Sequence, residues 1–281
     1  MVFLLDFRYG KNVTDEFVKN KLNWDRKYWV RTLKKLAKHS KVKQKKCYIC
    51  SGYKSKKVCN FYGINYLMCS NCSHVYGNKR LSENELTTYY STDEDYFKKA
   101  YTNKKLLALR KNLFIPKIKH VKKYATGKNW LDVGSGDGIA VSAAISEGFN
   151  GKGIEISKSA RGFARKYLNV ELYGQPLETF VLENKKKFDV VSFFGVLEHI
   201  TKPIEALKIS NKLLRKNGII VMEVPNYDSL SSYVQKLADV TDRHLDPTQH
   251  IMMFTLESAK YSLQKTGFRP IVVWCYGMDV I

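Results

Sequence analysis

Short apolar runs alternate with helical patterns from about residue 129 toward the end of the chain. Continuous apolar runs of four to eight residues, bounded by glycine or polar residues, are typical of buried strands, whereas apolar residues three and four apart are typical of helices. Regular alternation of the two predicts an α/β fold with a doubly wound, mostly parallel sheet. The expected strands lie near residues 129–133, 151–156, 170–173, 188–194, 219–224 and 270–275.

The part of the chain before this alternation has three different patterns. Basic residues around an apolar stripe that includes Trp24, Trp29 and Leu33 predict one or two helices at the N-terminus. Cysteines, glycines and short β-prone runs follow and indicate a small module of their own. We therefore expect a basic helical segment (1–46), a small cysteine-containing module (47–78), a helical connector (79–124) and the α/β domain (125–281).

The connector contains two local signals. Ser82 with Glu85 three residues later fits a capping box, in which each side chain accepts a hydrogen bond from the other residue's backbone, so a helix should begin there. Leucines and isoleucines then predict helix up to about Tyr124. Pro116 lies inside this pattern, and we expect it to interrupt the helix because proline lacks the backbone N–H.

Charge and hydropathy limit the function classes. The 281 residues carry 48 Lys and Arg against 26 Asp and Glu, a net charge of +22 that would favour a polyanion such as nucleic acid. The lysines are dispersed over helix surfaces rather than gathered in one groove, so a solvated basic surface is the simpler interpretation. There is no apolar run of about 20 residues, and residues 2–5 meet Asp6 too early for a signal peptide. We expect a soluble, cytoplasmic protein without a membrane span.

Two pairs of cysteines have the spacing of a zinc ribbon. Cys47 and Cys50 form one C-x2-C pair, Cys69 and Cys72 form the second, and 18 residues separate the pairs. Four thiolates complete a tetrahedron and leave no open position, so the predicted Zn²⁺ is structural rather than catalytic. Iron bound by the same four residues is an alternative at this spacing. The residues left over are Cys59, His74 and, within an apolar run, Cys275.

A glycine-rich loop follows the first expected strand of the α/β domain. Gly134, Gly136 and Gly138 would form a tight turn from strand to helix, where the absence of side chains lets a ligand touch the backbone. A dinucleotide fingerprint would need its third glycine at position 139, where Ile139 stands instead. The loop therefore predicts a nucleoside ligand other than a dinucleotide.

Two acidic residues refine this prediction. Asp132, two residues before the first glycine, would repel a pyrophosphate but suits a ligand that carries an ammonium and a sulfonium group. Glu155 lies about 20 residues beyond the first glycine, where an acid commonly accepts hydrogen bonds from two ribose hydroxyls. The expected ligand is a cation with a ribose.

This set of residues resembles the class I S-adenosylmethionine-dependent methyltransferases. The resemblance continues in Phe188–Phe194, in Gly195–Ile200 and in Leu213–Val221, which are similar to the fourth strand, the loop beside the methyl group and the fifth strand of that family. It implies S-adenosylmethionine as cofactor and an adenine contact in the segment that contains Gln175. The cofactor-binding residues that it implies are Asp132, Gly134, Ser135, Gly136, Gly138, Glu155, Ile156, Gln175, Leu177, Phe194 and Gly195.

A zinc module ahead of such a domain resembles methyltransferases of sugar and surface-polysaccharide pathways. This resemblance implies a small-molecule acceptor, a sugar or nucleotide-linked sugar in surface glycan biosynthesis. An rRNA or tRNA methyltransferase is the alternative suggested by the net charge, and a non-catalytic scaffold that keeps the fold is a second alternative. The fold alone does not identify the acceptor.

Methyl transfer to a hydroxyl also needs a proton acceptor, for which an imidazole is suited near neutral pH. The resemblance places His199 and His250 near the methyl group as catalytic candidates, although His199 also fits a structural role in its loop. In sugar C-methyltransferases a glutamate precedes the equivalent of His250. Gln249 stands there in this chain and disfavours C-methylation. Glu198 is expected to support the loop, and His244 is a possible second polar group.

Overall fold

The computed structural model describes residues 3–6, 26–92, 104–229 and 250–275. The chain divides into two compact units. The first unit comprises Met1–Glu85, Leu197–Glu205 and Val224–Ile281, and the second comprises Leu86–Val196 and Ala206–Glu223. The first unit is therefore built from three separate stretches of the chain. The predicted segment boundaries at residues 46, 78 and 124 stay a prediction.

The second unit contains a parallel sheet of four strands among its described residues. Its order is β10-β9-β7-β8, and every neighbouring pair is parallel. Nearly all side chains of β7 and β9 are buried, as expected for parallel strands that helices cover on both faces. The strands are β7 (Asn129–Val133), β8 (Asn150–Ile154), β9 (Phe188–Phe194) and β10 (Leu214–Glu223).

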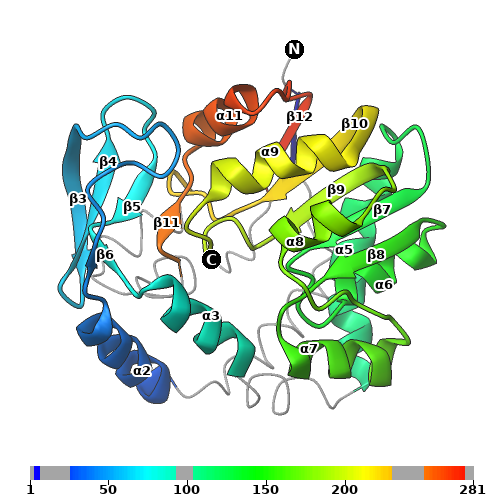
Figure 1. Cartoon of the computed structure of the whole chain (residues 1–281), viewed down its shortest axis with the longest axis horizontal. Coiled ribbons are helices and arrows are strands. Elements are labelled where there is room, and N and C mark those ends of the chain that lie inside the picture. Colours follow the sequence, from blue (N-terminus) through cyan, green and yellow to red (C-terminus); the bar gives the residue numbers. More distant parts are fainter. Residues whose placement is uncertain (1–2, 7–25, 93–103, 230–249, 276–281) are drawn as a thin grey trace. The chain divides into compact units, whose positions relative to one another are not determined.

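Helices connect these strands and surround the sheet, as Figure 1 shows. Helices α5 and α6 pack against each other, and Leu107, Ile139 and Phe163 join three helices in one buried cluster. This arrangement confirms the predicted doubly wound, mostly parallel α/β fold. The helices around this sheet are α5 (Lys104–Lys122), α6 (Ile139–Ser146), α7 (Lys158–Phe163) with a π-helical turn η1 (Ala164–Leu168), α8 (Leu177–Glu183) and α9 (Pro203–Leu213), and α3 (Glu83–Thr92) precedes them in the chain.

Three details of the sequence prediction are wrong. Residues 170–173 form no strand, and only Tyr173 makes an isolated bridge to Ile154, because Gly174 and Pro176 end the extended stretch at once. The expected strand at 219–224 begins earlier, at Leu214, with an irregular register before Ile219. Residues 272–275 are extended, but as β12 (Val272–Cys275) they pair with β1 (Phe3–Asp6) instead of joining the four-stranded sheet.

Pro116 does not interrupt its helix, contrary to the prediction. Helix α5 continues through Pro116 to Lys122. Proline inside a helix costs about 3 kcal/mol, but burial of an aliphatic side chain returns about 1.5 to 3 kcal/mol. Ile118 and Val121, which follow the proline, are both buried. Packing of the last turns therefore outweighs the lost backbone hydrogen bond.

The first unit contains an antiparallel sheet that runs through the cysteine module. Its order is β11-β5-β4-β3, so the outer strand β11 (Met252–Met253) comes from a distant part of the sequence. Phe61, Tyr66, Val75, Tyr227 and Met253 form its buried cluster. The other strands are β3 (Ser55–Phe61), β4 (Ile64–Cys69) and β5 (Val75–Gly77).

The remaining elements of the first unit are short. Helix α2 (Arg26–His39) agrees with the predicted basic helix, whereas β1 is a strand within a segment for which we predicted helices. Its hydrogen-bonding partner β12 is remote in the sequence, so no local pattern could reveal it. Strands β2 (Val42–Lys43) and β6 (Lys79–Arg80) pair antiparallel, and helix α11 (Leu256–Lys265) begins at a capping box on Thr255.

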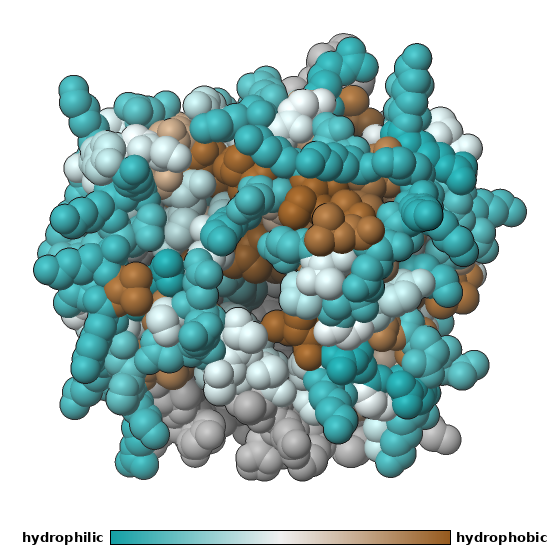
Figure 2. Space-filling view, viewed as in Figure 1, coloured by the Kyte–Doolittle hydropathy of each residue, from teal (hydrophilic) through white to brown (hydrophobic). Residues whose placement is uncertain are grey.

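Two surface properties follow from the composition. Hydrophilic residues cover most of the face of the molecule in Figure 2, in keeping with the 26% of charged residues. Among the helices in the described part of the chain, not one has the length and apolar character needed to cross a membrane.

Candidate functional site

The glycine loop connects β7 to α6 in left-handed backbone conformations. Gly134, Gly136 and Gly138 have φ angles of 70°, 52° and 77°, which side chains rarely permit. A Cβ atom on Gly134 would come within 2.7 Å of Val196, and one on Gly138 within 2.9 Å of Ala164. A Cβ atom on Gly136 would meet no atom within 4 Å. Packing thus requires the outer two glycines, and the open side of the loop lies at Gly136.

Asp132 at the end of β7 is buried, with 1% of its surface exposed. Its Oδ1 atom accepts a hydrogen bond of 2.6 Å from the Ser192 hydroxyl. Burial is the main cause of a pKa of about 7 for Asp132; the nearby Glu155 and Glu223 carboxylates also raise this pKa, and the hydrogen bonds from Ser192 and Ser135 lower it. A cation placed beside this carboxyl group would favour its ionised form, so the residue suits a positively charged ligand.

Glu155, directly after β8, is hydrogen-bonded to the glycine loop. One carboxylate oxygen accepts the Gly136 N–H at 2.8 Å, and the other accepts the Ser157 N–H at 2.7 Å. Burial raises its pKa, while these backbone hydrogen bonds oppose the shift. Each carboxylate oxygen has a second lone pair, so the group is held in place and can still accept hydrogen bonds from two hydroxyls.

The other predicted cofactor residues of the second unit lie at or just after the ends of β7, β8 and β9, or at the start of α8 and just before it. Ser135 is buried and donates to the Asp132 carbonyl oxygen, and the ring of Phe194 contacts that of Phe114 with centroids 5.2 Å apart. Gly195 follows β9 with a φ angle of 66°. The amide of Gln175 donates to Glu183 at the surface, which is the least specific of these arrangements. Ile156 is partly exposed, and Leu177 is buried.

Two ion pairs near these residues were not predicted from the sequence. Arg110 on α5 bonds to Asp137 in the glycine loop, and Asp137 also accepts the Ile139 N–H at the start of α6. Lys117 on α5 pairs with Glu223 at 2.7 Å. The sequence offered a signal for the acids, because Asp137 lies inside the glycine motif and Glu223 ends a strand. Their partners on α5 had no distinguishing pattern.

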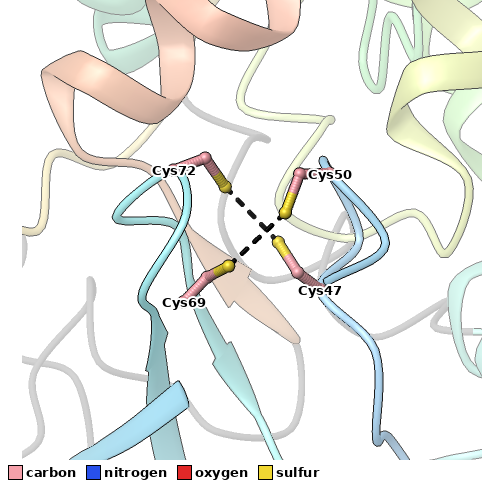
Figure 3. A group of neighbouring side chains, drawn as sticks. All are labelled: Cys47, Cys50, Cys69 and Cys72. Carbon is pink, nitrogen blue, oxygen red and sulfur yellow. Dashed lines mark hydrogen bonds between the residues drawn. The ribbon is translucent and has the colours of Figure 1, made fainter. Parts of the chain in front are cut away.

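The four predicted zinc ligands lie together in the first unit, with their sulfur atoms directed at one another (Figure 3). The Cys47 and Cys72 sulfurs are 3.6 Å apart, and those of Cys50 and Cys69 are 3.4 Å apart. Four Zn–S bonds of about 2.3 Å in a tetrahedron require separations of about 3.8 Å, whereas a disulfide requires about 2.05 Å. The donor set and its geometry therefore fit a closed tetrahedral zinc site.

Local interactions within the cysteine cluster support thiolates. The backbone N–H groups of Ile49 and Gly52 point at the sulfurs of Cys47 and Cys50, each at 3.4 Å. The hydrogen bond shared by Cys47 and Cys72 lowers the pKa of Cys72 and raises that of Cys47, so one thiolate forms readily in this pair. His74, left over in the sequence prediction, is a core residue: burial lowers its pKa to about 3, and its ring contacts Phe254.

A second cluster in the first unit contains Glu198, His199 and His250. One oxygen or nitrogen atom from each lies within 4.8 Å of the others. The two imidazole rings have centroids 4.7 Å apart, and the Glu198 carboxylate lies 3.8 Å from the His199 Nε2 atom. The hydroxyl of Tyr66 on β4 donates to the His250 carbonyl oxygen at 2.9 Å. The structure therefore brings both predicted histidines together; Gln249 and His244 lie outside the described residues.

Known proteins with similar sequences are methyltransferases. The chain is 30% identical over 105 residues to a ubiquinone biosynthesis O-methyltransferase of Aromatoleum aromaticum, across 36% of this chain and 45% of that protein. It is 31% identical over 116 residues to the protein of that name from Pasteurella multocida, across 36% of this chain and 48% of the relative. The chain thus spans about half the length of the curated relatives that it matches.

Solved structures give the same fold. The plantazolicin methyltransferase in complex with SAH is similar with a TM-score of 0.50 and 20% identity, over 65% of this chain and 73% of that one. A likeness at this identity shows the fold alone. A family model described as a methyltransferase domain matches residues 101–273, which include the glycine loop, Glu155 and both histidines. Because this match covers more than half of the 281 residues, the chain belongs to the methyltransferase domain family, with the class I S-adenosylmethionine-dependent fold.

Proposed function

We propose that this protein transfers a methyl group from S-adenosylmethionine to a hydroxyl group of a small polar acceptor. The observation that carries the proposal is the hydrogen bond from the Gly136 N–H to Glu155, beside the buried Asp132. It couples the carboxylate proposed to bind the ribose to the one glycine of the loop whose Cβ position is open. Ligands of doubly wound sheets bind at the carboxyl ends of the strands, where these residues lie.

In this proposal each part of the cofactor has its own contacts. Asp132 and the glycine loop receive the methionine end, whose ammonium and sulfonium charges favour the ionised carboxylate. Glu155 accepts hydrogen bonds from the ribose hydroxyls, and apolar and amide groups receive the adenine. The proposed cofactor-binding residues are Asp132, Gly134, Ser135, Gly136, Gly138, Glu155, Ile156, Gln175, Leu177, Phe194 and Gly195.

Transfer itself is an in-line displacement at the methyl carbon. The acceptor oxygen must lie about 3 Å from that carbon and must lose its proton. His250 is the preferred residue for this step and His199 the second, because their imidazoles are adjacent and the backbone of His250 is held by Tyr66. Imidazole can take a proton near neutral pH.

A structural zinc ion at the four cysteines would support the sheet that holds His250, the residue proposed to serve the acceptor. Cys69 ends β4, whose Tyr66 holds His250, and β11, which begins two residues after His250, belongs to the same sheet. We propose that zinc stabilises this sheet and so keeps His250 in position. The ion takes no part in the chemistry because its four protein ligands leave no open position.

For the acceptor we propose a hydroxyl of a sugar or nucleotide-linked sugar. The support is the combination of a cysteine module with a class I domain, and the concentration of polar candidates at Glu198, His199 and His250. The relatives are named as ubiquinone biosynthesis O-methyltransferases, so a phenolic hydroxyl is the second candidate. Both candidates are hydroxyls and place the same demand on a proton acceptor.

A radiolabelled methyl-transfer screen tests the proposal. Nucleotide sugars, glycan fragments, polyhydroxylated phenols and RNA are offered with labelled S-adenosylmethionine, and the expected product is a methylated sugar. Label in a phenol selects the second acceptor. Label in RNA, with an affinity that falls steeply with salt as counterions are released, selects the polyanion alternative. If calorimetry shows no binding of S-adenosylhomocysteine, the fold serves only as a scaffold.

A further inference from the structure

Among the described residues, the cluster of Glu198, His199 and His250 has the composition of a second metal site. Two imidazoles and one carboxylate are a donor set found in catalytic zinc sites, where three protein ligands leave further positions open. The cysteine cluster differs on this point, because its four thiolates fill the tetrahedron. We propose that Glu198, His199 and His250 bind one divalent cation of the Zn²⁺ or Mn²⁺ type and leave open positions for an acceptor oxygen.

The geometry supports a chelating cluster. The three donor atoms lie within 4.8 Å of one another, and the Glu198 and His199 donors are 3.8 Å apart. Bonds of about 2.1 Å place neighbouring ligand atoms of one ion about 3 Å apart. Small side-chain rotations would bring the three donor atoms from their present separations to this distance. Glu198 is 2% exposed. A divalent cation would add positive charge beside this buried carboxylate and favour its ionised form.

Two independent anchors hold these residues. Tyr66 donates to the His250 carbonyl oxygen, and the residue after His250 accepts the Gly77 N–H at 3.0 Å, so β4 and β5 fix the strand. Thr201, two residues beyond His199, donates to Glu83 at 3.0 Å at the start of α3. Ligands presented by such supported segments retain their geometry without the metal, which lowers the cost of binding.

The role of the cation rests on the proposed function. Bound to the acceptor hydroxyl as a Lewis acid, the cation would lower the pKa of that hydroxyl, so that its proton passes to solvent. The resulting oxygen attacks the methyl carbon, the new C–O bond forms as the C–S bond breaks, and sulfur keeps the electron pair to give S-adenosylhomocysteine. This inference replaces one step of the proposed function: His199 and His250 serve as metal ligands, and solvent instead of His250 accepts the proton.

Manganese binding tests the site without reference to activity. Mn²⁺ accepts imidazole and carboxylate ligands and competes poorly with zinc for thiolates, so it reports on this cluster while zinc stays at the cysteines. Electron paramagnetic resonance of the zinc-loaded full chain should show about one bound Mn²⁺, a stoichiometry expected of a single three-ligand site. His250→Ala and Glu198→Gln should each weaken Mn²⁺ binding at least about 100-fold. Loss of a residue that only hydrogen-bonds to a metal ligand weakens binding by up to about 100-fold, and loss of a ligand itself should weaken it at least as much.

His39→Ala is the matched control, because His39 is an exposed histidine on α2 and its removal should leave Mn²⁺ binding unchanged. If His250→Ala does not fold, as judged by circular dichroism, Glu198→Gln provides the same test with little change in side-chain volume. The inference is overturned if the wild-type chain binds neither Mn²⁺ nor a second Zn²⁺, or if the folded variants bind the ion as tightly as the wild type.

A second measurement separates this inference from the proposed function. Methyl transfer should stop when a chelator removes the ion from this cluster while elemental analysis shows zinc retained at the cysteines, and added Mn²⁺ should restore it. Transfer without any bound Mn²⁺ or second Zn²⁺ would overturn the metal site and leave the proposed function intact. Specific Mn²⁺ binding without transfer to any acceptor would support the metal site and overturn the proposed function.

Discussion

The candidate residues of the two units are assembled in different ways. In the second unit, Asp132, Gly136 and Glu155 lie within 24 positions of one another at adjacent strand ends, and the Gly136 N–H donates to Glu155. In the first unit, Glu198 and His199 meet His250 from across about 50 positions, and Tyr66 that holds His250 is more distant still. A local site can be recognised from spacing, whereas an assembled site depends on the fold.

This difference has a physical consequence for stability. A loop between a strand and the following helix is held by the sheet that it continues. The more remote contacts of this loop, from Ser192 to Asp132 and from Arg110 to Asp137, stay within the second unit. His250, proposed on the acceptor side of the reaction, is held by the cysteine-module sheet, whose outer strand β11 is contributed by the C-terminal stretch. Disturbance of that sheet should therefore affect the first unit and leave the proposed cofactor-binding residues of the second unit in place.

The largest expected effect comes from loss of the zinc site. Cys69→Ser should remove the metal, destabilise the first unit and abolish methyl transfer, because metal-binding free energy is folding free energy in such small modules. S-adenosylhomocysteine should still bind. Elemental analysis, calorimetry and the transfer assay measure the three quantities. Cys59→Ser, a change of the cysteine on β3 outside the cluster, is the control and should retain zinc. If Cys69→Ser loses cofactor binding and Cys59→Ser does not, the cofactor-binding residues depend on the first unit, contrary to the prediction.

His250→Ala should be the next largest effect. Transfer should fall at least about 100-fold, as expected for loss of a general base or of a metal ligand, while S-adenosylhomocysteine affinity stays within about 2-fold. Single-turnover kinetics and calorimetry measure these changes. His39→Ala should change neither quantity. Unchanged turnover in His250→Ala would remove this residue from the mechanism.

In the second unit, Glu155→Gln should weaken cofactor binding about 10- to 100-fold, because hydrogen bonds to a charged group contribute about 1.5 to 3 kcal/mol. The rate at saturating cofactor should change much less. Calorimetry with S-adenosylhomocysteine gives the affinity, and Glu171→Gln, a change of an exposed acid that pairs with Arg165, is the control. Normal affinity in Glu155→Gln would show that the ribose is bound elsewhere.

The buried Asp132 predicts a pH dependence of cofactor binding. With a pKa of about 7 in the free protein, the carboxyl group is mostly protonated at pH 5.5, and a cationic ligand must first displace that proton. Affinity for S-adenosylmethionine should therefore rise about 10-fold between pH 5.5 and 7, according to proton linkage. Above about pH 8 the cofactor's own amino group loses its charge and opposes the rise. A slope that persists in Asp132→Asn would assign the effect to another group.

Tyr66→Phe is the smallest and most selective change. It removes the hydrogen bond to the His250 carbonyl, a contribution of about 0.5 to 1.5 kcal/mol, and should lower transfer about 2- to 10-fold. Zinc content and cofactor affinity should stay unchanged. If turnover is equal to that of the wild type, the sheet does not position His250 through this bond.

The sequence predicted most of the second unit because its signals are local. Asp132, the three glycines and Glu155 lie at fixed intervals around one strand, one turn and the next strand. The prediction failed where long-range packing decided the outcome. Helix α5 passes through Pro116 because buried residues follow it, and residues 170–173 make one bridge only. The ion pair of Lys117 with Glu223 had no signal on the lysine side.

The sequence by itself determined the parallel α/β fold, the glycine loop with its two acids, and the grouping of four thiols, because strand and helix periodicity and short ligand spacings are properties of local chain geometry. The resemblance named His199 and His250, but only the tertiary structure decided that their rings group with the Glu198 carboxylate, and that β11 completes the cysteine-module sheet. Contacts of this kind depend on burial and hydrogen bonding between remote segments. No interval within the sequence encodes those interactions in a readable form.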